Sequence, residues 1–250
     1  MAQIITEAPA AQEALKQLFA THERVVFFGG AGVSTASGIP DFRSADGLYH
    51  QRFKYPPETM LSHSFYVTHR AEFYDFYRTK MIALGAEPNQ AHRKLAQLEA
   101  EGVLLAVVTQ NIDGLHQAAG SKRVYELHGS VHRNICGRCH ATYSAEWIMA
   151  REHDDAHGVP VCPKCGGDIK PDVVLYEESL DEDVLTGAVR AIMRADALIV
   201  GGTSLVVYPA AGLISYFGGD TLAIVNLDPT PQDAAADLLI SCDLAQAFAF

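Results

Sequence analysis

The sequence lacks any block rich in lysine or arginine. Its 250 residues include 30 Asp and Glu against 19 Lys and Arg, which gives a formal net charge of −11 at pH 7. Proteins bind nucleic acid largely through clustered cationic side chains, so this balance disfavours a nucleic-acid partner. The excess of acid suits a cationic partner such as a lysine-rich peptide, although charge alone favours simple solubility as its explanation.

The N-terminal stretch lacks the marks of an export or membrane segment. In MAQIITEAPAAQEALKQLFA, acidic residues interrupt the apolar ones, and there is neither a basic leader nor a long hydrophobic run. We therefore expect no membrane association and a cytoplasmic location. Internal repeats and low-complexity linkers are also missing, and a chain of this length, 48% hydrophobic, can form one large domain or a domain with an insertion.

Cysteine is scarce, but its spacing is informative. Four of the five cysteines form two C-x-x-C pairs, Cys136 with Cys139 and Cys162 with Cys165. Two such pairs on tight turns can close a tetrahedron of thiolates around a structural zinc ion, worth on the order of 10 kcal/mol to folding. The alternatives are a redox dithiol, which usually needs one C-x-x-C at a helix start, or free thiols.

Apolar runs along the chain predict an α/β fold. Strands are predicted at 25–28, 103–108, 124–127, 173–176, 197–200 and 222–227. Helices are predicted at 10–20, 65–81, 91–100, 181–194 and after Pro209. The strands are apolar without alternation, which is typical of a parallel sheet covered on both faces, and ligands bind such sheets at the carboxyl ends of the strands.

The run Gly30 to Arg43, GAGVSTASGIPDFR, follows the first predicted strand. Gly30 and Gly32 permit close backbone approach, and a strand-to-helix turn offers free N–H groups and a positive helix end to a pyrophosphate. Arg43 can add a bidentate clamp. The spacing departs from G-x-G-x-x-G and the usual acidic residue is not at a second strand end, so an ordinary dehydrogenase is disfavoured. The alternative is a simple glycine-rich turn.

A second polar run, TQNIDGLH, begins at Thr109 after another predicted strand. Asn111 and Asp113 together can pair with a carboxamide, because the amide offers a donor and an acceptor while the carboxylate accepts from NH₂. The alternative is an Asx turn that caps the next helix.

His128, in LHGS, is the candidate general base, because an imidazole titrates near neutral pH. The chain holds eleven histidines, and His116, His132 and His140 lie nearby as competing candidates. His140 is adjacent to Cys139 and can be mistaken for a zinc ligand.

Three further runs also lie at predicted strand ends or on strands. Thr203 and Ser204, after Gly201 and Gly202, can donate to phosphate or ribose. Asn226 and Asp228 can hold ribose hydroxyls. The run Val173, Val174, Leu175 and Tyr176 either offers an edge to an extended peptide, with Tyr176 lining a side-chain tunnel, or is a buried strand.

Together these residues resemble the sirtuins, the NAD-dependent protein lysine deacylases, over nearly the whole chain. The similarity rests on GAGVSTASGIPDFR, TQNIDGLH, the His-Gly pair at 128–129, the paired cysteines, GTSLVVYPA from Gly202, and IVN ending at Asn226. The resemblance implies a Rossmann-like parallel-sheet domain formed by residues 1–43, 86–130 and 169–250. It also implies an inserted small domain, with a helical module at 44–85 and a zinc ribbon at 131–168.

The resemblance assigns His128 as general base, with Asn111 and Asp113 beside the nicotinamide. The residues that match NAD contacts are Gly30, Ala31, Gly32, Ser34, Ile39, Asp41, Phe42, Arg43, Gln110, Asn111, Asp113, Gly202, Thr203, Ser204, Asn226, Asp228 and Cys242. The acetyl-lysine contacts are Val173, Val174 and Tyr176.

The resemblance further implies that NAD is consumed: the acetyl oxygen attacks the ribose as nicotinamide leaves, and free lysine and O-acetyl-ADP-ribose are released. The implied partners are proteins or peptides that carry acetylated lysine. The expected oligomeric state is a monomer or a weak oligomer. Mono-ADP-ribosyl transfer and a non-catalytic NAD-sensing zinc protein are the alternatives.

Two positions depart from the family pattern. Glu177 stands where many relatives have glycine, which affects how a peptide backbone is held. Sirtuins that prefer succinyl or malonyl groups carry a tyrosine and an arginine three apart, whereas the nearest pair here is Tyr77 and Lys80. We therefore predict a preference for uncharged acyl groups, since no arginine offers a bidentate partner to an acyl carboxylate.

Overall fold

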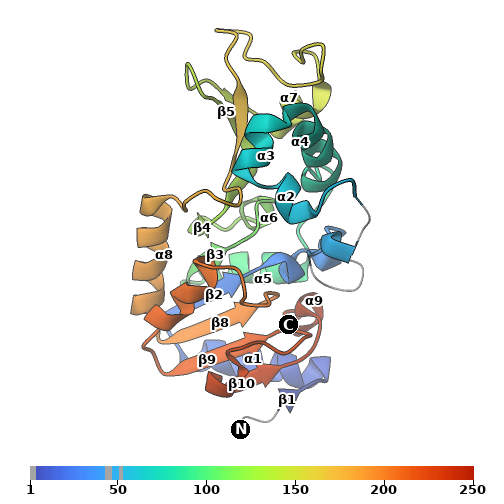
Figure 1. Ribbon diagram of the computed structural model, residues 1–250. Helices are drawn as coiled ribbons and strands as arrows, with labels where there is room; N and C mark the ends of the chain where they lie inside the picture. The colour runs from blue at the N-terminus through green and yellow to red at the C-terminus, as the bar shows by residue number, and fades with distance from the viewer. Residues whose placement is uncertain (1–3, 43–46, 51–52) are drawn as a thin grey trace.

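The large lobe is built on a parallel sheet (Figure 1). The computed structural model describes residues 4–42, 47–50 and 53–250, and within them seven strands pair in the order β1-β10-β9-β8-β2-β3-β4, every neighbour parallel. The strands are β1 (Ile4–Ile5), β2 (Val25–Gly29), β3 (Leu104–Thr109), β4 (Val124–Glu126), β8 (Ala197–Gly201), β9 (Thr221–Val225) and β10 (Leu238–Ile240). The predicted Rossmann-like fold is confirmed.

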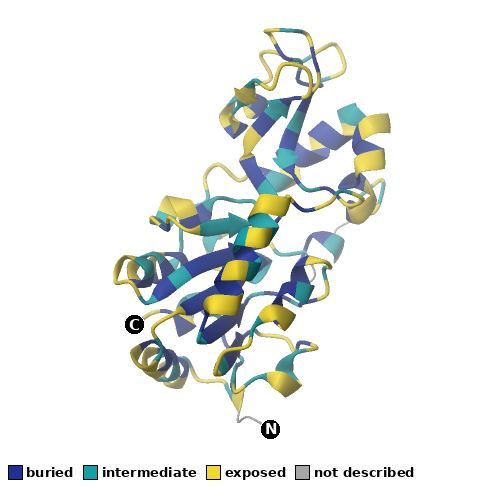
Figure 2. Cartoon of the chain, turned by 90° about the vertical axis from the view of Figure 1, so that its left-hand side faces the viewer, coloured by how far each residue is buried: buried dark blue, intermediate teal, exposed yellow. Residues whose placement is uncertain are grey.

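Both faces of this sheet are covered, which is why its strands read as continuous apolar runs. On β2, Val25 and Phe27 enter one hydrophobic core, while Val26 and Phe28 enter the other. Figure 2 shows the central strands as buried. Helices α1 (Ala8–Thr21), α5 (Gln90–Ala100) and α9 (Leu244–Ala247) contribute to the first core, and α8 (Glu182–Arg194) and the 3₁₀ helix η5 (Ala210–Tyr216) to the second.

A smaller lobe lies above the large sheet in Figure 1. It contains an antiparallel sheet in the order β6-β5-β7, with β5 (Gly129–Cys136), β6 (Thr142–Tyr143) and β7 (Ile169–Val173). Its helices are α2 (Pro57–Met60), α3 (His63–Thr68), α4 (Arg70–Phe76) and α7 (Ala145–Ala150). One hydrophobic cluster joins Phe73 and Tyr74 of α4 to Ile148 of α7 and Ile169 of β7, so segments far apart in sequence share a core.

A buried arginine ties these segments together. Arg78, only 2% exposed, donates from Nε to the Ile148 carbonyl (2.9 Å) and from Nη1 to the Gly158 carbonyl (2.8 Å). Its Nη2 pairs with Asp154 Oδ1 at 2.7 Å. Every one of these partners lies in the cysteine-bearing segment, so a charged side chain fixes the helical segment to it.

Several elements differ from the sequence predictions. The helix predicted at 65–81 is divided at His69 into α3 and α4, and ends in a π turn, η4 (Tyr77–Met81). Tyr66 and Tyr74 both donate to the Ile169 carbonyl. In one straight helix they would stand about 12 Å apart along the axis, so the break lets both reach one acceptor.

The strand predicted at 173–176 is β7, which begins and ends earlier in the chain. The prediction placed it too late because Pro171 interrupts the strand pattern in the sequence. The helix predicted after Pro209 is the 3₁₀ helix η5, and the short edge-side strands β1 and β10, of two and three residues, were not predicted. The remaining short elements are the 3₁₀ helices η1 (Ala31–Val33), η2 (Thr35–Ser37), η3 (Leu48–His50) and η6 (Asp233–Ala235), and α6 (Leu115–Ala119). Among the described residues, no helix has the length and apolar character needed to cross a membrane.

Candidate functional site

A cavity of about 400 Å³ opens at the carboxyl ends of β2, β3, β8 and β9. Gly30, Gln110, Gly202 and Asn226, each the first residue after one of these strands, line it from the large lobe. From the small lobe its wall includes residues of η4 and β7. The cavity therefore lies where the two lobes meet.

The cavity collects side chains that the sequence analysis singled out separately. The predicted site residues in its wall are Gly30, Ala31, Gly32, Ser34, Ile39, Asp41, Phe42, Gln110, Asn111, Asp113, His128, Val173, Val174, Tyr176, Gly202, Thr203, Ser204, Asn226, Asp228 and Cys242. Arg43 lies outside the described residues. The wall also includes residues that were not predicted, among them Lys80, Tyr208 and Leu227.

The glycine-rich turn after β2 differs from the expected strand-to-helix turn. Two short 3₁₀ helices, η1 and η2, follow β2, so the described part of this turn contains no long helix that could direct a positive end at the cavity. The Gly30 N–H donates to the Gly201 carbonyl (3.1 Å) and the Gly32 N–H to the Gly202 carbonyl (2.8 Å). A Cβ on Gly32 would lie 2.7 Å from the Gly202 Cα, so glycine is needed here for the contact between two loops.

Ser34, Asn111 and Asp113 form one hydrogen-bonded group on the cavity wall. The Ser34 hydroxyl donates to Asp113 Oδ2 (2.6 Å) and accepts from Asn111 Nδ2 (3.1 Å). The other Asp113 oxygen, Oδ1, accepts from the Leu115 N–H (2.9 Å) at the start of α6. The Asx-type cap that was the alternative interpretation of this run is therefore present, and the same carboxylate also faces the cavity.

His128 lies at the crossing from β4 to β5, where the chain passes from the large sheet to the small one. Its Nδ1 is 2.9 Å from the Gln110 carbonyl oxygen. A carbonyl only accepts, so Nδ1 carries the proton and Nε2 of the neutral ring has the free lone pair. Burial lowers the pKa of His128 below its ordinary value, against the opposing effect of the Gln110 carbonyl, so this free base persists at neutral pH.

The residues predicted to contact phosphate and ribose also belong to the cavity wall. Gln110 Nε2 donates to the Thr203 hydroxyl (3.0 Å), which joins the ends of β3 and β8. Asn226 Nδ2 donates to the Asp228 carbonyl (2.7 Å). Cys242 is buried, and burial raises the pKa of its thiol, so it is a neutral group at this end of the cavity.

The predicted peptide-binding run has most of its amide groups in use. The Val174 N–H donates to the His128 carbonyl (3.0 Å) and the Tyr176 N–H to the Leu61 carbonyl (3.0 Å). The Glu177 backbone has a φ of 77°, which favours glycine, and its carboxylate accepts from the Ser64 N–H (2.9 Å) and hydroxyl (2.5 Å). Glu177 thus adopts a backbone conformation that favours glycine and adds a carboxylate to the cavity wall.

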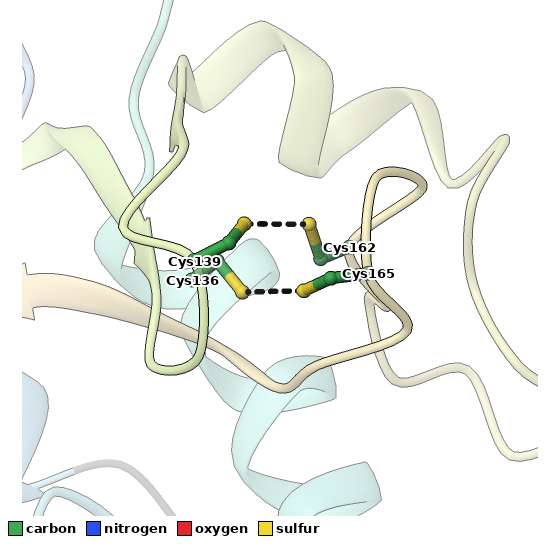
Figure 3. Close-up of side chains that lie close together, drawn as sticks. All are labelled: Cys136, Cys139, Cys162 and Cys165. Atoms are coloured by element: carbon green, nitrogen blue, oxygen red, sulfur yellow. Dashed lines mark hydrogen bonds between the residues drawn. The ribbon is translucent and has the colours of Figure 1, made fainter.

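The four paired cysteines converge in the small lobe (Figure 3). Their sulfurs lie within 4.8 Å of one another, with Sγ–Sγ distances of 3.5 Å for Cys136 and Cys165 and 3.6 Å for Cys139 and Cys162. These distances far exceed a disulfide bond and approach the roughly 3.8 Å edge of a tetrahedron of sulfurs around zinc. The donor set therefore fits a closed structural zinc site, and His140 beside it is an exposed residue.

Sequence reasoning missed Asn89 and His92, at the start of α5. Both are hydrogen-bonded to the turn after β2, and His92 is fully buried. A capping box in which Asn89 is followed three residues later by His92 was the available signal.

The fold and the cavity together define a Rossmann-like α/β protein with an inserted cysteine-bearing module. A model of the Sir2 family matches residues 30–209. The chain is 57% identical over 229 residues to an NAD-dependent protein deacetylase of Clostridium acetobutylicum, covering 91% of this chain and 92% of that one. It is 45% identical over 232 residues to one of Staphylococcus epidermidis, covering 92% of each. The chain belongs to the Sir2 family.

Solved structures agree with this assignment. A Sir2 structure with a deacetylated p53 peptide and 3'-O-acetyl ADP ribose matches with a TM-score of 0.87 and 41% identity, covering 95% of each chain. A Sir2 structure with a p53 peptide and NAD⁺ matches with a TM-score of 0.83 and 41% identity over the same shares.

Proposed function

We propose that this protein removes acetyl groups from lysine side chains of proteins, consuming NAD and releasing nicotinamide and O-acetyl-ADP-ribose. Its relatives at 57% and 45% identity are NAD-dependent protein deacetylases, and its structural neighbours hold peptide with NAD⁺ or with acetyl ADP ribose. The observation that carries the proposal is that every predicted catalytic, NAD and peptide residue the structure describes lines one cavity. NAD bound there supplies an activated ribose carbon and a leaving nicotinamide.

His128 is the general base of this proposal. Its Nε2 has the free lone pair, because Nδ1 donates to the Gln110 carbonyl. That hydrogen bond also fixes the plane of the ring, so the base meets a ribose hydroxyl in one orientation. The lowered pKa keeps Nε2 unprotonated through neutral pH and extends activity to more acidic solution than an ordinary histidine allows.

Asn111 and Asp113 are proposed to hold the carboxamide of nicotinamide. Asn111 is 9% exposed and Asp113 is partly buried, so water competes little with a ligand for these groups. A carboxylate accepts from the NH₂ group, and an amide both donates and accepts, which matches the two ends of a carboxamide. Because Ser34 already joins the two side chains, their spacing is set before a ligand arrives.

Zinc is proposed to have a structural role, held by Cys136, Cys139, Cys162 and Cys165. Four thiolates fill a tetrahedral site and leave no position for a substrate. Cys136 and Cys162 also belong to the core shared by the helical and cysteine-bearing segments. We propose that these segments, 44–85 and 131–168, act as one small domain that closes the acetyl-lysine side of the cavity.

The acyl preference is proposed to be for uncharged groups. Tyr77, 1% exposed, belongs to the small-lobe core, and Lys80 lines the cavity with its Nζ 5.5 Å from the Phe53 ring centre. A lysine there offers a point charge and not the bidentate fork of arginine. Comparing kcat/KM for acetyl- and succinyl-lysine peptides tests this preference, and faster desuccinylation would overturn it.

Mass spectrometry of the products tests the function itself. The purified protein is incubated with NAD and a panel of acetyl-lysine peptides, and we expect nicotinamide, unmodified lysine peptide and acetyl-ADP-ribose in equal amounts. The matched control is His128→Ala, which should keep the circular-dichroism spectrum of the parent and lose turnover. A protein that gains an ADP-ribosyl mass would indicate mono-ADP-ribosyl transfer, and nicotinamide binding without turnover would indicate an NAD sensor.

A further inference from the structure

The first turn of α5 is hydrogen-bonded to the loop that carries Ser34. Asn89 Nδ2 donates to the Val33 carbonyl (2.7 Å) and to the Ser37 hydroxyl (3.0 Å). Asn89 Oδ1 meanwhile accepts from the Ala91 N–H (2.9 Å), which caps the helix. One side chain therefore caps the helix and also contacts the loop on both sides of Ser34, at the Val33 carbonyl and the Ser37 hydroxyl.

His92 extends this connection to the Ser34 hydroxyl itself. Its Nδ1 accepts from the Asn89 N–H at 3.3 Å, so the neutral ring carries its proton on Nε2. Nε2 lies 3.5 Å from Ser34 Oγ and is positioned to donate to it. The two acceptor positions of the hydroxyl then face His92 and Asn111, and its single proton points to Asp113.

Burial keeps the His92 ring neutral and in place. His92 is fully buried, and burial lowers its pKa to about 4, in spite of the nearby Asp113 carboxylate. The ring of His116, 1% exposed, packs edge-to-face on it with centroids 4.7 Å apart. Within the described residues neither ring nitrogen of His116 has a hydrogen-bond partner, so His116 contacts His92 through ring packing alone.

We propose that Asn89 and His92 are positioning residues that set the direction of the Ser34 hydroxyl and thereby hold Asn111 and Asp113 ready for the nicotinamide carboxamide. Neither side chain is among the residues that line the cavity, so both act through Ser34. The inference rests on the proposed function and adds to it the residues that determine affinity for the nicotinamide end of NAD.

Two substitutions at His92 separate its roles. In His92→Asn, the side-chain oxygen can replace Nδ1 and accept from the Asn89 N–H, but no group reaches Ser34. In His92→Gln, the longer amide can place a donor near the position of Nε2. Loss of one neutral hydrogen bond corresponds to about a 3- to 10-fold change. We expect His92→Asn to raise the KM for NAD and the nicotinamide inhibition constant by about that factor, with kcat changed less, and His92→Gln to restore most of the loss.

A cap variant elsewhere controls for stability. Ser144 caps α7 in the small lobe by accepting from the Trp147 N–H (3.3 Å) and is not among the cavity-lining residues. Ser144→Ala should lower Tm through loss of the cap without changing either constant. Ser34→Ala should weaken nicotinamide binding, and adding His92→Asn to it should have no further effect, because both act through one hydroxyl.

Calorimetric titration of NAD into each variant gives a readout that does not need turnover. If the parent protein binds NAD but shows no deacetylation, the proposed function fails, and the positioning role is still decided by the ratio of the NAD affinities. Three results would each overturn the inference. The first is an NAD KM and a nicotinamide inhibition constant in His92→Asn equal to those of the parent. The others are an equal loss of affinity in His92→Asn and His92→Gln, and additive losses when His92→Asn is combined with Ser34→Ala.

Discussion

Mild acid should destabilise this protein through His92, and the size of the effect follows from its burial. The His92 ring is fully buried and has a pKa of about 4, against 6.5 for the exposed group. Between these two values the unfolded chain binds a proton that the folded chain does not. Stability contributed by the neutral ring is therefore complete above pH 6.5, falls as the pH drops below 6.5, and levels off below pH 4.

The linkage relation gives the magnitude. Lowering the pH from 7 to 5.5 should cost about 1 kcal/mol of unfolding free energy from this one group. Burial also lowers the pKa of His116 and His128, so the whole protein should lose more. The specific contribution of His92 is therefore measured against a variant that cannot titrate there.

The assay is urea unfolding of the parent protein and of His92→Asn at pH 7 and pH 5.5. The variant retains His128 and the four-cysteine site, so their contributions cancel in the difference between the two proteins, and the difference reports the buried His92–His116 pair. We expect the variant to lose about 1 kcal/mol less than the parent over this interval. An equal loss in both proteins would refute the assignment of a neutral, buried His92.

Three further predictions concern the small lobe and its junction with the sheet. Cys162→Ala should remove zinc and lower Tm sharply, and metal analysis with unchanged zinc and unchanged melting would contradict a structural site. Arg78→Ala should cost about 3–5 kcal/mol, because it leaves Asp154, whose side chain is only 10% exposed, without its partner. Urea unfolding measures this loss, and a value under about 1 kcal/mol would rule out the ion pair as an anchor. Gly129→Ala should lower the free energy of unfolding by about 2–4 kcal/mol, because φ is 74° and the new Cβ would overlap the Asp172 carbonyl oxygen. A Tm equal to that of the parent would count against so close an approach of β5 and β7 at this residue.

Much of the large lobe could be predicted because its strands are buried on both faces. Val25 to Phe28 reads as a continuous apolar run for that reason, and polar runs begin where such strands end. The paired cysteines were equally readable, since C-x-x-C spacing places two sulfurs on one turn. The domain boundaries and the roles of the individual site residues stay predictions.

Other features depend on contacts between distant segments. The turn after β2 was expected to expose its N–H groups, but Gly30 donates to Gly201 at the end of β8 and Gly32 to Gly202 directly after it. Arg78 reads in sequence as a surface residue of an aromatic helix, and only its partners in the 148–158 segment explain why it is buried.

The amino-acid sequence by itself determined the parallel sheet, the four-sulfur cluster and the family, because burial periodicity and short-range spacing are local properties. The tertiary structure alone decided which way the Ser34 hydroxyl points. That direction depends on His92, Asn111 and Asp113, which belong to different segments, and a hydrogen bond is set by distance and angle that only packing provides.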